Sequence, residues 1–252
     1  MRAGANQALS YKPVGEISPP RPEPLPALVR LIPMTVVDLT QLCEQYLEKQ
    51  LLGDRRAALG LINAAMAAGV AAGDLRANVV QVAQMEIGKL WQQGKINIAQ
   101  EHVATTISQL ALAHLFQNAQ FRARLNRKVL VACVPGEHHE FPARLLADTL
   151  DIAGYDVRFL GADVPLDSLI ESVEMEKPDV LALSVTMLFH VPSLTATVRS
   201  VRAKSRHPVR IAIGGGVFNS APQLAADIGA DIVAPNAEAF VAQLSTHLGA
   251  PA

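Results

Sequence analysis

The segment Glu137-His138-His139-Glu140 combines acids and imidazoles directly after a short apolar run. Imidazole is the commonest metal-binding side chain, and a carboxylate bonded to its second nitrogen fixes the tautomer and raises its basicity. Glu137 and His139 are two residues apart, so the carboxylate either supports the imidazole or competes with it. The alternative interpretation is a solvated loop whose acids lie near a helix N-terminus for electrostatic reasons.

Two other segments have side chains or backbone suited to a ligand. Ser184 ends an apolar run and is followed by Thr186 and His190; such hydroxyls either bond a ligand inserted along a sheet or cap turns. Gly214-Gly215-Gly216 allows close backbone approach and positive φ. Its spacing matches neither a dinucleotide fingerprint nor a P-loop, so a turn and a phosphate cradle both remain open.

A third set lies far upstream. Trp91 is followed by nine residues and then by Glu101-His102. Trp91 ends one predicted helix and the Glu-His pair opens the next, so helix pairing can bring all three to one end of a bundle. Taken singly, Trp91 is better explained as a core residue and Glu101 as a first-turn acid, but that explanation is weaker for the three residues together.

The elements that hold Trp91, Glu101 and His102 form a predicted four-helix bundle over residues 34–125. Apolar residues recur at helical spacing: Leu39, Leu42, Cys43, Tyr46 and Leu47 mark the first helix. The second helix runs from Asp54 to about Ala68. The third runs from about Leu75 to Trp91 and is expected to bury Val79, Val82, Met85 and Leu90. The fourth follows Asn97, with Val103, Ile107, Leu110 and Ala111 on one side. Short connections favour antiparallel packing.

From residue 127 to 250 the pattern changes to alternating strands and helices. Apolar runs of strand length lie at 129–134, 156–160, 179–185, 209–214 and 231–234, with helices predicted at 142–154, 165–176, 191–204, 221–229 and 236–248. Such alternation predicts a doubly wound parallel sheet of the Rossmann-like, flavodoxin-like class. Ligands of such sheets bind at the carboxyl ends of the strands, where all the loop residues above are found.

Composition narrows the function classes. The chain has 252 residues, 50% of them hydrophobic, and 22 Lys+Arg against 23 Asp+Glu give a net charge of −1. That balance argues against a protein that coats nucleic acid or an anionic membrane. The two cysteines form no disulfide framework, and no signal peptide or membrane span is recognised, so we expect a cytoplasmic protein. Residues 1–33 carry seven prolines and are predicted to be a flexible arm without a helix-turn-helix.

Together these segments resemble the cobalamin-binding, light-responsive transcriptional regulators. The family's loop motif, Asp or Glu-x-His-x-x-Gly, corresponds to Glu137 and His139, with Pro142 at the glycine position. Its strand-end Ser and its Gly-Gly turn correspond to Ser184 and Gly214–Gly216. The Trp-x9-Glu-His motif of the photoreceptor branch, typified by CarH and LitR, is present intact. The absence of a recognised DNA-reading module makes the chain similar to AerR/PpaA-type antirepressors.

The resemblance implies roles for these residues. His139, beside His138, would be the lower ligand of cobalt with Glu137 as its partner, and Ser184, Thr186 and Gly214–Gly216 would line a slot for the nucleotide tail. Trp91, Ile98, Glu101 and His102 would roof the upper face. Light would break the bond from cobalt to its upper group, and His102 would then occupy the freed position as a second metal ligand.

The implied function is a cobalamin-dependent antirepressor, holding adenosylcobalamin or hydroxocobalamin, whose partner is a transcriptional repressor protein of photosynthesis genes. Three alternatives stay open. These are a corrinoid methyl-carrier protein, a haem-binding redox or oxygen sensor, and a metal-binding protein without an organic cofactor. No acid/base pair, P-loop, nucleophile elbow or HExxH motif is recognised, so we expect no independent catalysis.

Overall fold

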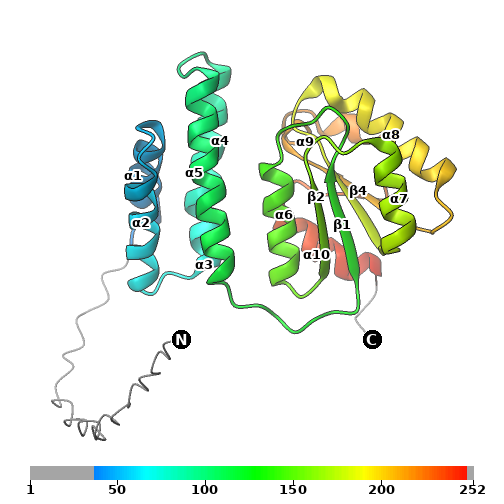
Figure 1. The fold of residues 1–252 in the computed structure, drawn as a ribbon, viewed down its shortest axis with the longest axis horizontal. Coiled ribbons are helices and arrows are strands. Elements are labelled where there is room, and N and C mark those ends of the chain that lie inside the picture. Colours follow the sequence, from blue (N-terminus) through cyan, green and yellow to red (C-terminus); the bar gives the residue numbers. More distant parts are fainter. Residues whose placement is uncertain (1–36, 249–252) are drawn as a thin grey trace, which may run out of the picture. The chain divides into compact units, whose positions relative to one another are not determined.

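The computed structural model describes residues 37–248. The predicted Pro-rich arm at residues 1–33 lies outside the described residues. Within them, an all-helical part precedes a parallel sheet wrapped by helices, which confirms the predicted fold class (Figure 1). No helix among residues 37–248 is long and apolar enough to cross a bilayer.

Four helical segments form the bundle. They are α1 (Leu39–Leu51), α2 (Arg55–Ala67), a continuous run of α3 (Ala72–Leu75), the π-helical turn η1 (Arg76–Val80) and α4 (Gln81–Gln92), and finally α5 (Ile98–Gln117). Their starts follow local chemistry. Asp38 and Asp54 accept backbone N–H groups at the starts of α1 and α2, and Asn97 and Gln100 form a reciprocal capping box on α5.

The second part is a five-stranded parallel sheet in the order β2-β1-β3-β4-β5. The strands are β1 (Lys128–Cys133), β2 (Asp156–Gly161), β3 (Val180–Ser184), β4 (Arg210–Gly214) and β5 (Ile232–Val233). The order reverses between β1 and β3, so the loops that follow these two strands open side by side. A doubly wound sheet binds its ligand at this switch point.

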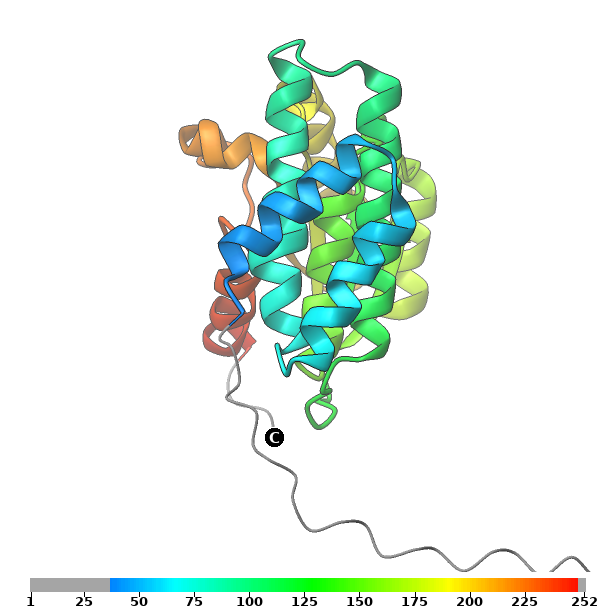
Figure 2. The same ribbon diagram turned by 90° about the vertical axis from the view of Figure 1, so that its left-hand side faces the viewer.

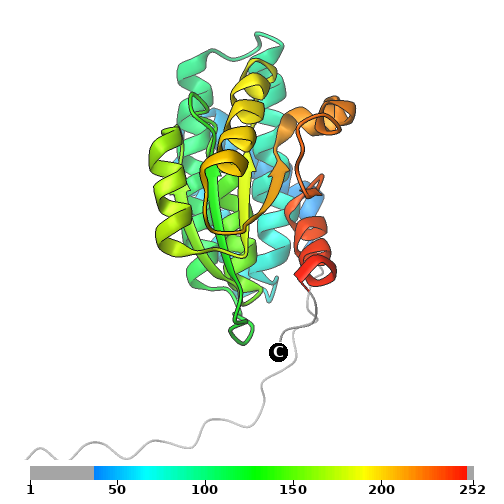
Figure 3. The same ribbon diagram turned by 90° about the vertical axis from the view of Figure 1, so that its right-hand side faces the viewer.

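Helices cover both faces of the sheet. The helices are α6 (Phe141–Ile152), α7 (Leu166–Glu176), α8 (Val191–Lys204), the short α9 (Gly216–Ser220) and α10 (Ala237–Leu248), with the 3-10 turns η2 (Leu188–His190) and η3 (Pro222–Ala225). Alternate β1 residues divide the core. Val129 and Val131 pack with α6 and α10, whereas Leu130 and Ala132 pack with α7 and α8. Figures 1 and 3 show α7 and α8 on the face turned away from the bundle.

The bundle rests on α6. Phe141 and Leu145 of α6 belong to the apolar core of the bundle rather than to that of the sheet. Above them, the Gln109 amide of α5 donates to Glu140 Oε1 at 3.1 Å. The helices α1 and α2 lie on the outer side of α4 and α5 (Figure 2). The inner helices α4 and α5 therefore face the carboxyl ends of the strands.

Some local predictions are wrong. No helix spans 221–229; α9 begins earlier, at Gly216, and ends at Ser220, since Ala221 leaves the helical conformation (φ −141°, ψ 63°) before Pro222, whose ring disfavours a helical residue ahead of it. Val82, Met85, Val103 and Leu110 are exposed instead of buried. The core stripe of the third helix is Leu75, Val79, Ala83 and Ile87, so it repeats every four residues and includes a small alanine.

Candidate functional site

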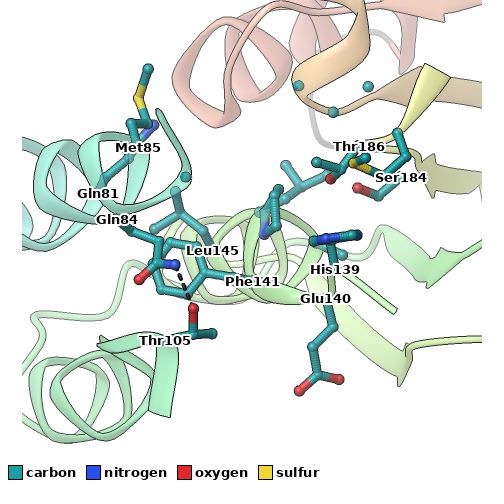
Figure 4. A pocket seen from close by; sticks show the side chains of 18 of the residues that line it. Gln81, Gln84, Met85, Thr105, His139, Glu140, Phe141, Leu145, Ser184 and Thr186 are labelled. Carbon is teal, nitrogen blue, oxygen red and sulfur yellow. Dashed lines mark hydrogen bonds between the residues drawn. The ribbon is translucent and has the colours of Figure 1, made fainter. Parts of the chain in front are cut away.

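A cavity of about 770 Å³ lies between the inner helices of the bundle and the carboxyl ends of β3 and β4. Figure 4 shows Gln84, Met85 and Thr105 on its bundle side and His139, Ser184 and Thr186 on its sheet side. All the predicted site residues except Glu137 line it: Trp91, Ile98, Glu101, His102, His138, His139, Ser184, Thr186, Gly214, Gly215 and Gly216. Segments far apart in the sequence thus meet around one space.

Glu137 lies beneath the cavity, and its side chain is wholly buried at the switch point of the sheet. Its Oε1 accepts the backbone N–H of His139 at 2.9 Å and lies 2.5 Å from His139 Nδ1. Its Oε2 accepts the N–H groups of Thr186 at 2.8 Å and Met187 at 3.1 Å, and lies 3.0 Å from His190 Nδ1. One carboxylate therefore ties the loop after β1 to the loop after β3.

The hydrogen bonds to Glu137 keep it ionised. Burial by itself would raise the pKa of the carboxyl group, but the bonds from His139, His190 and the Thr186 N–H hold that pKa well below its usual range. The bond to Glu137 also raises the pKa of His139, against the opposing effect of burial. Glu137 thus supports His139 and has no free oxygen with which to compete for a ligand.

The tautomer of His139 follows from its partner. An ionised carboxylate only accepts hydrogen bonds, so Nδ1 of His139 carries a proton, and in the neutral ring the lone pair is on Nε2. The imidazole is half-exposed and lines the cavity, which leaves Nε2 available to a metal ion. The neighbouring His138 is exposed at the cavity, and Glu137 bonds His139 rather than His138.

Behind His139, the sheet presents polar groups without partners. The hydroxyl oxygens of Ser184 and Thr186 are buried and make no hydrogen bond within the described chain. Leaving such groups unsatisfied is costly, so a cavity lined by them favours a ligand with polar atoms at this depth.

Gly215 completes this slot. Its φ is +115°, and a Cβ there would lie 2.0 Å from the carbonyl oxygen of Val185. No other residue type allows this approach of β4's end to the loop after β3. The glycine turn therefore lets the end of β4 lie close against the loop after β3, and the phosphate cradle stays a prediction.

The opposite wall comes from the bundle. Trp91 at the end of α4 and Ile98, Glu101 and His102 in the first turns of α5 line the same cavity. The His102 side chain is 71% exposed, and its Nε2 lies 3.7 Å from Glu101 Oε2. His102 therefore has room to move, whereas Glu101 is largely covered.

His190 was not among the predicted site residues. Its Nδ1 donates to Glu137, and its ring packs edge-on against Phe189 with ring centroids 4.3 Å apart. The usable sequence signal was a histidine a few residues beyond the end of a strand at the switch point. Pro142, at the motif's glycine position, lies in the first turn of α6, where its missing N–H costs no hydrogen bond.

Thiolate ligation and a bare metal cluster find no support. Burial raises the pKa of Cys133 to about 12, with Glu137 and Glu140 adding to the effect, so the thiol stays protonated. Across residues 37–248, no group of three or more His, Cys, Asp or Glu side chains could hold a metal ion. His139 is the lining histidine that a buried carboxylate orients, and one oriented imidazole in a large, mainly apolar cavity is suited to a metal that an organic ring already holds.

Comparison with known families decides the cofactor. Residues 42–116 and residues 127–245 match two family models, each described as a B12 binding domain. Both parts of the chain are B12-binding domains. The cofactor is therefore cobalamin, with its cobalt, and the haem alternative is set aside.

Related proteins fall into two groups. The chain is 28% identical over 63% of its length to dimethylamine corrinoid protein 1 of Methanosarcina acetivorans, covering 75% of that protein. It is 30% identical over 48% of its length to the HTH-type transcriptional repressor CarA of Myxococcus xanthus, covering 41% of CarA. The solved monomethylamine corrinoid protein of Methanosarcina barkeri shares the fold, with a TM-score of 0.68 at 21% identity over 84% of this chain and all of that one.

The residues of these B12-binding domains fit cobalamin. His139 offers a free Nε2 to cobalt, and Ser184 and Thr186 offer unpaired hydroxyls at the depth of the sheet. Gly215, which lines the same cavity, lets the end of β4 approach the Val185 backbone closely. The bundle wall closes over the other side with Trp91. The roles of the individual residues as ligands remain predictions.

Proposed function

We propose that this B12-binding protein is a light-responsive regulator of transcription that acts as an antirepressor. One observation carries the proposal: His102 from the bundle and His139 from the sheet domain line the same cavity. An imidazole on each domain gives a change at the cofactor a direct route to a change between the domains. Trp91, Glu101 and His102 further support the proposal, because their spacing resembles the motif of the cobalamin photoreceptors.

The chain's own residues would divide the work. Glu137 holds the Nδ1 proton of His139 and leaves Nε2 free to hold cobalt, while Trp91 and Ile98, on the bundle wall of the cavity, would cover the bound cofactor. When bound, an alkylated cobalamin supplies a bond from cobalt to carbon that light breaks. His102, whose side chain is exposed, would be the bundle residue able to occupy the position that the upper group leaves. Because α5 carries His102, binding of His102 to cobalt would draw the bundle toward the sheet domain.

The proposed partner is a transcriptional repressor protein, of photosynthesis genes by the resemblance. The net charge of −1 supports a protein partner, since contacts to nucleic-acid phosphates favour a basic surface. The related CarA is itself named a transcriptional repressor, which supports a role in transcription.

A second function is supported by a different observation. The match to a dimethylamine corrinoid protein covers 75% of that protein, and the fold matches that of a monomethylamine corrinoid protein. This favours a corrinoid protein that carries a methyl group for a methyltransferase. In that case His102 would have no ligand role, and the upper face would have to open to an enzyme.

The light product separates the two functions. Free adenosylcobalamin is itself sensitive to light, so the informative comparison is the visible spectrum of the product in wild type and in His102→Ala. We expect both proteins to bind adenosylcobalamin in darkness and only the wild type to give a histidine-bound product. His114→Ala, on the same helix but bonded to Asn63 away from the cavity, should behave as wild type. Identical products in His102→Ala and wild type would favour the carrier.

A further inference from the structure

A chain of hydrogen-bonded side chains crosses the interior of the bundle, starting at the cavity wall. Thr105 Oγ1 donates to Glu101 Oε1 at 2.6 Å, and the Gln84 amide donates to Thr105 Oγ1 at 2.6 Å, the bond drawn in Figure 4. Ser108 Oγ donates to Gln84 Oε1 at 2.7 Å, and the Gln50 amide donates to Ser108 Oγ at 2.7 Å. The chain joins α5, α4 and α1.

The carboxylate of Glu101 fixes the direction of every bond. A carboxylate only accepts, so the Thr105 hydroxyl must donate to it and must itself accept from Gln84. Gln84 then offers its carbonyl to Ser108, which in turn accepts from Gln50. Each donor along the chain therefore points toward Glu101, an arrangement in which neighbouring bonds strengthen one another.

At the end of the hydrogen-bonded series that is far from the cavity, Gln50 has a buried oxygen without a partner. Gln50 is 1% exposed, and its amide group donates both to Ser108 and to the Ala104 carbonyl at 3.0 Å. Both donations fix the amide, so its oxygen is left buried without a partner. That cost is tolerated only while the two donations persist. Gln50 stands in the last turn of α1, and the exposed Leu51 and Leu52 follow it.

We propose that Gln50, Ser108 and Gln84 are positioning residues that hold Glu101 at the cavity through Thr105, and that the same chain couples the cavity wall to the end of α1. The inference rests on the proposed place of Glu101 over the upper face of cobalamin. Filling the cavity removes water from the Glu101 carboxylate and fixes its partners. The bonds behind Glu101 tighten as a result, and the last turn of α1 becomes more firmly held.

Hydrogen exchange of the full-length protein tests the coupling. The amides of Leu52, Gly53 and Asp54 bond to the carbonyls of Glu48, Gln50 and Lys49, so their exchange reports opening of the end of α1. We expect hydroxocobalamin, bound in darkness and confirmed by its absorption, to slow this exchange in the wild type. Because no light is used, a failure of light sensing leaves the test intact.

A matched pair of variants separates coupling from general loosening. Gln50→Met cuts the chain only at α1, leaving the bonds among Ser108, Gln84, Thr105 and Glu101. It should bind hydroxocobalamin with the wild-type spectrum but lose the slowing of exchange at the end of α1. Gln41→Met makes the same change on the exposed side of the same helix and should keep the response.

A second pair cuts the chain at the cavity end. Thr105→Val removes the link to Glu101, whereas Thr106→Val removes only a bond to the helix carbonyl of His102. We expect loss of the α1 response in Thr105→Val and its retention in Thr106→Val, which keeps the proposal testable if Gln50→Met does not fold. An unchanged response in Gln50→Met or Thr105→Val, or no response in the wild type, would overturn the coupling.

Discussion

The Nδ1 atom of His139 lies 2.5 Å from the Oε1 atom of Glu137, and the Glu137 side chain is wholly buried. This pairing determines which ring nitrogen of His139 is free. It also anchors the loop after β1 from below, because the second oxygen of Glu137 bonds the loop after β3. The imidazole is thus set in place before any cofactor arrives, which lowers the cost of binding.

Replacing His139 should weaken cobalamin binding most. We expect His139→Ala to raise the Kd by at least about tenfold, since loss of even an outer partner of a metal ligand costs roughly 10–100-fold. Titration of hydroxocobalamin followed by its visible spectrum measures this. His138→Ala is the control and should bind as wild type. The reverse ranking of the two variants would transfer the ligand role to His138.

Glu137→Gln tests the carboxylate without changing its size. An amide would place hydrogens where the N–H groups of Thr186 and Met187 need acceptors. We expect binding of cobalamin to weaken by roughly 10–100-fold and the apo-protein to unfold at lower urea concentration. Wild-type cobalamin affinity and wild-type stability in Glu137→Gln would show that the charge of Glu137 is not needed to orient His139 or the loop after β3.

His190 acts through Glu137 and should show a smaller effect. Without the bond to Glu137 Oε2, which is 3.0 Å long, we expect His190→Ala to weaken cobalamin binding by about tenfold. His190→Asn can place an amide nitrogen near the lost Nδ1 and should restore much of the affinity. Equal weakening in both variants would instead point to lost packing of the ring on Phe189.

The sequence was sufficient for the sheet domain because parallel strands are buried on both faces. Runs such as Val129–Val134 are apolar throughout, and every strand but β4 is followed by a helix of ordinary length. The meeting of Glu137 with Ser184 and Thr186 also follows from topology, since loops at a switch point open together. That Trp91 and His102 lie at the same cavity could be predicted from the antiparallel pairing of two consecutive helices, α4 and α5.

The bundle was harder to predict because its interior is partly polar. Ser108 and Gln50 are buried and hydrogen-bond to each other. A prediction that assigns only apolar residues to the core therefore misses these two and wrongly places Val103 and Leu110 there. Small core residues such as Ala83 are missed as well, because a search for large apolar side chains does not find them. The role of His190 depends on a bond between residues 53 apart in sequence, for which a local motif gives no sign.

Gly215 should be intolerant of any side chain. Gly215→Ala combines a φ of +115° with a Cβ placed 2.0 Å from the Val185 carbonyl oxygen, so we expect a loss of at least about 2 kcal/mol in the free energy of unfolding. Gly60→Ala, within α2 with open space around it, should gain up to about 1 kcal/mol. Urea denaturation of the two apo-proteins checks both values. Equal midpoints for the two variants would contradict the close approach at Gly215.

The most direct test of the account is electron paramagnetic resonance of the protein loaded with cobalamin and reduced to the cobalt(II) state. The splitting by the lower nitrogen ligand should change from a three-line to a two-line pattern when the protein's histidine carries the heavy nitrogen isotope. His139→Ala should abolish this dependence on the label. A three-line pattern that ignores the label would show that the cofactor's own benzimidazole still binds cobalt, and would contradict ligation by His139.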